Sequence, residues 1–231
     1  MSSGSQTQPP VSDVAAGVPT DHPGITELFG VLACGELAAF YRLASEANMA
    51  PDIRGRVEMA SMAAAEMSHF EILQGALKAR GVDVYDSIAA YKPVLEKYHA
   101  STVPSNWHES LVKAYVGDGL AADFYVEVAG TLPADAEGVV RTVMSETGHS
   151  EFAVTAIRDA VEADPNLRSP LTLWGRRLLG EAITQTQYVL AGQEALTELL
   201  FSVEADLNQI VEFFGSIQDR HAQRMSDMGL G

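Results

Sequence analysis

Cysteine and aromatic residues are both scarce in this chain of 231 residues. The single cysteine, Cys34, excludes an internal disulfide and is typical of a protein that works in a reducing compartment. Aromatic residues make up 7% of the chain although 47% of it is hydrophobic, so alanine, leucine, valine and methionine supply most of the apolar content. Because alanine, leucine and methionine favour helices, whereas aromatic residues favour strands, the composition predicts helices.

Positive charge is scarce as well. The chain has 15 lysines and arginines against 31 aspartates and glutamates, which gives a formal net charge of −16. A surface of this sign repels phosphate backbones unless its few cations are gathered in one place. They are scattered in pairs such as Lys78 with Arg80 and Arg176 with Arg177. Nucleic-acid binding is therefore not expected.

Long hydrophobic runs are also missing, since no apolar run approaches the roughly 18 residues that a membrane span needs. The first 24 residues are rich in serine, proline and glycine, and they lack the basic and apolar regions of a signal peptide. We expect a disordered tail over residues 1–24, no membrane span, and a cytoplasmic protein.

Turn-forming residues divide residues 25–231 into one predicted domain of six helices. The predicted helices span about 25–48, 52–80, 105–130, 133–163, 169–192 and 193–226. A long connection over about 82–104, which contains two prolines, joins the second helix to the third. Among the first four predicted helices, the first and third connections are short and the second is long. This is the connection pattern of a four-helix bundle with one crossover. We expect a four-helix core over about 25–163, with the two further helices packed outside it.

Polar residues interrupt the apolar seam of the second predicted helix. Its seam residues step by three and four positions, as on one buried helix face, and they are Met59, Met62, Glu66, His69, Leu73 and Ala76. The fourth predicted helix repeats this pattern with Glu146 and His149 inside its seam. Glu36 in the first helix and Asp118 in the third also fall on seam positions. A buried, unpaired carboxylate is costly, so four of them at matched positions indicate one shared site.

An internal similarity relates the two halves of the predicted bundle. "AEMSHFE" (65–71) resembles "SETGHSE" (145–151), and "GELAAFY" (35–41) resembles "GDGLAADFY" (117–125) apart from two extra residues. Two similar helical hairpins would meet about a pseudo-twofold axis. The four acids would then converge at one level of the bundle.

This combination of residue types predicts a pair of metal ions. A Glu-x-x-His pair places both side chains on one helix face. Two such pairs, with one acid from each remaining helix, form the ligand set of di-iron and di-manganese carboxylate bundles. Four carboxylates also neutralise two divalent cations, and carboxylates with imidazoles suit iron, with manganese as the alternative. The predicted metal ligands are Glu36, Glu66, His69, Asp118, Glu146 and His149.

Three alternatives remain open at this point. Each Glu-x-x-His pair, taken by itself, also fits a buried ion pair on one helix face. Asp123 is an alternative to Asp118 as the third-helix ligand, although helix geometry turns it about 140° from Asp118. Glu96 and His99 share the same spacing, but they lie between two prolines without an apolar seam, so we expect them on the surface.

The quoted motifs resemble the ferritin-like superfamily and, within it, the tRNA hydroxylases that oxidise a methylthio-isopentenyl adenosine. The matching stretches are "GELAAFY", "AEMSHFEIL" and the run from "VGDGLAADFY" through "SETGHSEF", within about residues 30–155. The resemblance implies dioxygen activation at two iron ions and insertion of a hydroxyl group into an unactivated C–H bond. Two departures are the aspartate at position 118, where the family usually has glutamate, and the acidic charge, which disfavours a tRNA substrate.

The resemblance also implies a role for each predicted ligand. The implied terminal ligands are Glu36 and Asp118, the histidines that cap one iron each are His69 and His149, and the bridging carboxylates are Glu66 and Glu146. No catalytic residue is predicted beyond these metal ligands.

We therefore expect an all-α, ferritin-like bundle that acts as an oxidoreductase of the hydroxylase type. Its expected partners are a small-molecule or modified-nucleoside substrate and a reductase that supplies electrons. Neither a membrane nor a nucleic acid is an expected partner, and an oligomer remains open. The alternatives are a ferroxidase or peroxide-scavenging protein, and a metal-binding module without catalytic activity.

Overall fold

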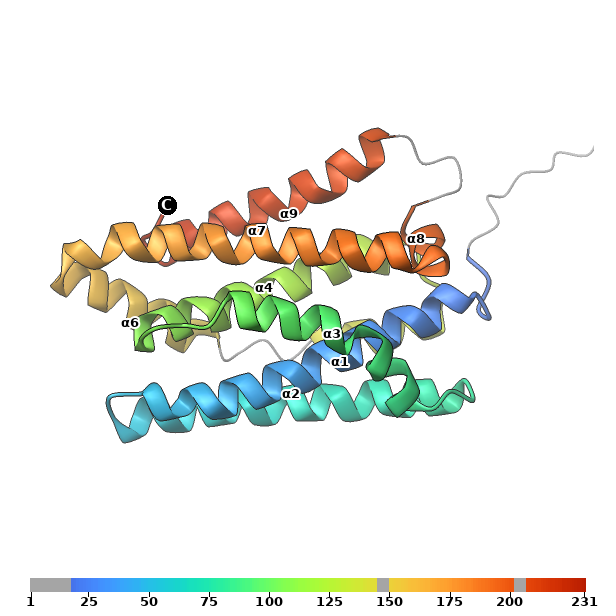
Figure 1. The fold of residues 1–231 in the computed structure, drawn as a ribbon, viewed down its shortest axis with the longest axis horizontal. Coiled ribbons are helices and arrows are strands. Elements are labelled where there is room, and N and C mark those ends of the chain that lie inside the picture. Colours follow the sequence, from blue (N-terminus) through green and yellow to red (C-terminus); the bar gives the residue numbers. More distant parts are fainter. Residues whose placement is uncertain (1–17, 145–149, 202–206) are drawn as a thin grey trace, which may run out of the picture.

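The computed structural model describes residues 18–144, 150–201 and 207–231, and all regular secondary structure within these ranges is helical (Figure 1). The predicted all-α class is therefore confirmed. The described helices are α1 (Pro23–Glu46), η1 (Ala47–Met49), α2 (Ile53–Ala79), α3 (Val84–Ser101), α4 (Trp107–Ala129), α5 (Ala134–Met144), α6 (Ser150–Ala163), η2 (Pro165–Leu167), α7 (Arg168–Gly192), α8 (Glu194–Leu200) and α9 (Leu207–Asp227). Of the tail predicted over residues 1–24, only residues 18–24 are described, and α1 begins within them.

Helices α1 and α2 form a hairpin along one side of the molecule (Figure 1). Asp52 caps α2, because its Oδ1 accepts a 2.8 Å hydrogen bond from the backbone N–H of Gly55. The seams predicted for these two helices face the core. Met59 and Leu73 on α2 and Leu43 on α1 are all fully buried.

The long connection predicted over residues 82–104 contains an 18-residue helix, α3, which is not among the six predicted helices. Asp83 caps this helix by accepting hydrogen bonds from backbone N–H groups of its first turn. Pro93 removes one backbone donor inside the helix. Close packing of α3 against α1 compensates for this lost donor. Tyr91 is 4% exposed, and a Cβ atom on Gly30 of α1 would lie only 3.1 Å from the Tyr91 ring.

The fourth predicted helix, over 133–163, corresponds to α5 and α6. Residues 145–149, between these two helices, lie outside the described part of the chain. Helix α4 packs against both of them, and α5 also packs against α2. The predicted four-helix core is thus represented by α1, α2, α4 and the α5–α6 segment.

The sixth predicted helix, over 193–226, consists of two helices rather than one. Helix α8 ends at Leu200, and Phe201 adopts an extended backbone with φ −126° and ψ 123°. Leaving the helix allows the Phe201 ring to pack edge to face on Phe213 of α9, with 5.5 Å between the ring centroids. A rule based on turn residues misses this break because it is caused by a distant contact.

The C-terminal helices cover the bundle. Helix α7 packs along α3 and α4, on the side of them away from the α1–α2 hairpin, and α9 packs on α4 and α7 (Figure 1). Trp174 of α7 donates a 2.9 Å hydrogen bond from its indole nitrogen to the Glu109 carbonyl of α4. Helix α8 packs on α1. These contacts make α7 one wall of an internal space.

The segment Pro23–Met49 is long and apolar enough to cross a membrane, judged by length and composition alone. In the folded chain it lies in the core and contacts α2, α3 and α8. Ile25, Leu28 and Phe29 are each at most 1% exposed. Packing against the other helices therefore accounts for its apolar character.

Candidate metal centre and cavity

Two carboxylates and one imidazole meet between α1 and α2. They belong to Glu36 of α1 and to Glu66 and His69 of α2, and one ligand atom from each lies within 4.8 Å of the others. The Nδ1 atom of His69 is 3.4 Å from Glu36 Oε2 and 3.9 Å from Glu66 Oε2. Three positions along a helix bring Glu66 and His69 to the same face, and the hairpin places Glu36 opposite them.

This cluster is buried. The exposed fraction is 7% for Glu36 and 9% for His69, and the Glu66 side chain is 12% exposed. Ionised groups in such a position need a compensating charge or a proton. The acids were predicted from their place in apolar seams, and they do lie within the core.

The pKa values of the cluster reflect excess negative charge. Burial, and then hydrogen bonding with the Glu36 carboxyl, raises the pKa of Glu66 to about 7, although His69 opposes the shift. Hydrogen bonding with Glu36 and then with Glu66 raises the pKa of His69 to about 10, against the effect of burial. Without another cation, the cluster therefore retains protons at neutral pH.

The donor set fits a divalent metal ion. Within the described ranges, His69 Nε2 is buried without a hydrogen-bond partner, while its Nδ1 faces the carboxylates. A cation bound here would displace the retained protons and supply the missing charge. Carboxylate oxygens with an imidazole nitrogen suit iron or manganese, whereas a site for softer ions would have thiolate ligands.

The structure does not describe the side chains of the other three predicted ligands. Glu146 and His149 lie outside the described residues, and for Asp118 the structure describes the backbone in α4 but not the side chain. Their assignment stays a prediction. Val143 and Met144, at the end of α5, line the same cavity as Glu36 and Glu66.

Asp123, the alternative third-helix ligand, is bound by arginines instead. Its side chain is buried, and Oδ1 lies 2.9 Å from Nε of Arg220 on α9. Arg224 of α9 pairs with the other carboxylate oxygen and donates a 2.8 Å hydrogen bond to the Gly119 carbonyl. Gly119 permits this approach, because a Cβ atom there would overlap the Arg224 side chain. Asp123 does not line the cavity, and its geometry is that of a structural ion pair.

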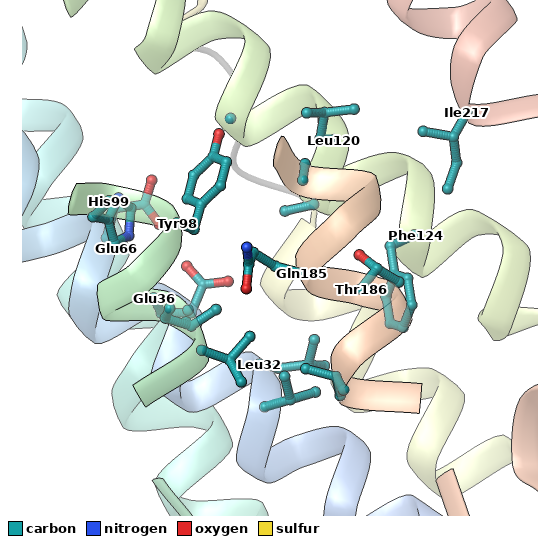
Figure 2. A pocket seen from close by; sticks show the side chains of 18 of the residues that line it. Leu32, Glu36, Glu66, Tyr98, His99, Leu120, Phe124, Gln185, Thr186 and Ile217 are labelled. Atoms are coloured by element: carbon teal, nitrogen blue, oxygen red, sulfur yellow. The ribbon is translucent and has the colours of Figure 1, made fainter. Parts of the chain in front are cut away.

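The Glu36–Glu66–His69 cluster opens on a cavity of about 290 Å³ between α1, α2, α3, α4 and α7. Most of its lining is apolar, and Leu32, Leu120, Phe124 and Ile217 project into it (Figure 2). The residues of α4 that line it are Lys113, Gly117, Leu120, Ala121 and Phe124. Among the described side chains, this set contains none of the apolar seam predicted for the third helix, which is Leu111, Tyr115, Asp118, Ala122 and Tyr125; Leu111 packs with α6 and α7 instead.

His99 was expected on the surface together with Glu96, and for His99 this was wrong. Glu96 is exposed and pairs with Lys92 at 3.4 Å. His99 lines the cavity near its polar end (Figure 2), and burial lowers its pKa to about 3. Because the connection is a helix, one of its faces turns inward and carries His99 with it.

Sequence reasoning missed five residues that bring polar groups to the cavity, namely Arg42, Tyr98, Lys113, Gln185 and Thr186. Lys113 is 2% exposed, and burial, followed by the charge of Arg42, lowers its pKa to about 7. Gln185 is 5% exposed, and its Oε1 has no hydrogen-bond partner among the described residues. The signal for Lys113 is its place inside the apolar run "LVKAYV".

Comparison with known proteins identifies the family of this chain. The model of a family described as a ferritin-like domain of actinomycetes matches residues 20–203. A solved structure, described as protein 19 with aldehyde deformylating oxidase activity from Synechococcus, covers 93% of both chains with a TM-score of 0.68 and 18% identity. No protein of curated function matches this chain. The structural match shows a shared fold, and the family model covers most of the sequence, so the chain belongs to the actinomycete ferritin-like domain family.

Proposed function

We propose that this protein is a di-iron, oxygen-dependent oxidoreductase of the hydroxylase type that acts on a small organic molecule. The observation that supports this most is the direct opening of the buried Glu36–Glu66–His69 cluster onto an apolar cavity. A metal site beside a largely apolar cavity can confine a reaction to a bound substrate and limit the access of water. A site that only stores or oxidises metal ions has no need of such a cavity.

In this proposal two iron ions, or manganese in their place, are held by the six predicted ligands. Glu36, Glu66 and His69 are the described half of the set, and Asp118, Glu146 and His149 are the other half. Iron would supply the activation of dioxygen, with electrons from a partner reductase. The resemblance to tRNA hydroxylases and the fold shared with a protein named for aldehyde deformylating oxidase activity both support this class of chemistry.

The chain's own residues would bind and orient the substrate. The cavity volume of about 290 Å³ lies near the lower end of the range for small-molecule sites, which is roughly 300–1,000 Å³. Leu32, Leu120 and Phe124 offer apolar surface to the substrate and keep water from the cluster. The net charge of −16 supports a free small molecule rather than a whole tRNA.

Metal analysis of protein made under iron-replete conditions tests the centre itself. We expect about two iron ions per chain, the content of a six-ligand carboxylate bundle. Glu66→Ala should lose most of this metal, whereas Glu71→Ala, an exposed acid of the same helix, should keep it. Unchanged metal in the Glu66→Ala protein would refute the ligand assignment.

Oxygen consumption then separates the hydroxylase from its alternatives. The proposal requires dioxygen uptake that depends on both a reductant and an organic substrate. Rapid oxidation of Fe(II), or peroxide consumption, without an organic partner would indicate a ferroxidase or peroxide-scavenging protein. Bound metal with neither activity would indicate a metal-binding module.

A further inference from the structure

A buried lysine stands at one end of the cavity without an acidic partner. Lys113 of α4 is 2% exposed, and its Nζ donates a 2.5 Å hydrogen bond to the Thr102 carbonyl. The Tyr98 ring centroid lies 5.7 Å from the same atom. An ammonium group has three donors, and the Thr102 oxygen is the one acceptor among the described residues. Such a group is costly to bury unless another acceptor arrives.

A second cation faces the same space from α1. The Nη1 atom of Arg42 lies 3.0 Å from Glu46 Oε2, and both side chains are 9% exposed. Arg42 and Lys113 both line the cavity, and after burial itself, the charges of these two cations lower the pKa of His99. When Lys113 is protonated, two cations and one carboxylate give this end of the cavity a net positive charge. Among the described residues, this cationic end is formed by Arg42, Glu46 and Lys113.

The rest of the lining is mostly apolar, with Tyr98, His99 and Thr186 as further polar residues beside the metal cluster, and Gln185 projects into the middle of the cavity (Figure 2). Gln185 and the cationic end together supply donors to a space that otherwise suits hydrocarbon. A buried charge in an apolar pocket is the arrangement that selects an amphipathic ligand of opposite charge. A fully apolar ligand would leave the Lys113 donors unpaired.

We propose that the cavity binds an amphipathic carboxylate, whose anionic end pairs with Lys113 and Arg42 and whose apolar chain lies against Leu120 and Phe124. Both cations are suited to this: a guanidinium binds a carboxylate through two parallel hydrogen bonds, and an ammonium binds it as a point charge. This inference rests on the proposed function only in taking the cavity to be the substrate site. It names the substrate class as a small organic acid.

Binding of octanoate and 1-octanol, measured by calorimetry, tests the proposal, because the two probes have chains of equal length and differ in charge. The full chain is used both as purified and after chelation of metal. We expect octanoate to bind at least about tenfold more tightly than octanol in both samples, as charge-assisted hydrogen bonds imply. Equal affinities, no binding of either probe, or loss of the preference after chelation would overturn the proposal.

Variants assign the preference to the cationic end. Lys113→Met should remove it by weakening octanoate binding at least about tenfold while octanol binding stays unchanged. Lys97→Met, which removes an exposed lysine over Tyr188, is the matched control and should change neither affinity. Glu46→Gln keeps both cations and removes the competing acid, so it should tighten octanoate binding. A preserved preference in Lys113→Met, or weaker octanoate binding in Glu46→Gln, would contradict the proposal.

The outcome is independent of the test of the metal centre. Octanoate binding in the chelated protein requires neither iron nor turnover, so it can succeed where metal analysis fails. In that case the cavity would be a carboxylate site without redox chemistry. A metal-loaded enzyme that binds octanoate and octanol equally would instead keep the proposed function and lose this inference.

Discussion

Two of the regions in which the described chain buries carboxylates stabilise them in opposite ways. Between α4 and α9, Asp123 lies between the guanidinium groups of Arg220 and Arg224, so its charge is compensated within the fold. Between α1 and α2, Glu36 and Glu66 share one imidazole, and the pKa of Glu66 rises to about 7. The first region carries its own cations. The second keeps protons at neutral pH, and a cation from outside could replace them.

The largest expected effect comes from removing the carboxylate of the self-compensated region. Asp123→Asn would leave Arg220 and Arg224 without their shared acid in a largely buried position. We expect the free energy of unfolding to fall by about 3 kcal/mol, measured by urea denaturation of the metal-free protein. Asp159→Asn, an exposed acid on α6, is the control and should change it by no more than about 0.5 kcal/mol. A loss as small as that of the control would remove the contrast between the two regions.

Added metal should stabilise the folded protein through the Glu36–Glu66–His69 cluster and not through the Asp123 region. Mn(II) at about 100 times its dissociation constant should stabilise the folded protein by about 2.7 kcal/mol, seen as a higher melting temperature. Glu66→Gln should abolish this gain, whereas Glu71→Gln, in the same helix but exposed, should retain it. A full gain in the Glu66→Gln protein would show that Mn(II) binds elsewhere.

A smaller effect concerns pH and the α4–α9 contact. His221 of α9 is 4% exposed, and burial, followed by the charge of Arg224, lowers its pKa to about 4. The unfolded chain binds this proton near pH 6.5 and the folded chain only near pH 4, so stability is lost as pH falls between these values. His221 should contribute about 2 kcal/mol to the loss between pH 7 and pH 5. In His221→Gln, the difference between the free energies of unfolding at pH 7 and pH 5, measured by urea denaturation, should be smaller by about 2 kcal/mol. An unchanged difference would contradict this role of His221.

Periodicity was sufficient to predict the hairpin half of the site. Glu36, Glu66 and His69 interrupt apolar seams in two long helices, and spacing alone places Glu66 and His69 on one face of α2 and Glu36 in the seam of α1. It failed for the cavity side of α4, because Lys113 lies outside the seam that the hydrophobic pattern selects. The arginines that pair with Asp123 could not be found by any local rule, since Arg220 and Arg224 lie far from it in the sequence.

The fold shows the same division between local and distant causes. The positions of α1, α2 and α4 follow from caps and apolar periodicity, which are local. Helix α3 was missed because Pro93 suggested a break, yet the contact of Tyr91 with Gly30 holds that segment against α1. The end of α8 at Leu200 likewise depends on the contact between Phe201 and α9.

Helix α3, which crosses over between the two halves of the bundle, can change its side chains independently of the predicted metal ligands. Helix α3 supplies Tyr98 and His99 to the cavity, but none of the predicted metal ligands lies on it. Its side chains can therefore be exchanged to admit a bulkier or differently charged guest without disturbing the residues proposed to carry the chemistry. Diversification of what such a protein accepts would be concentrated in the segment that joins the two halves.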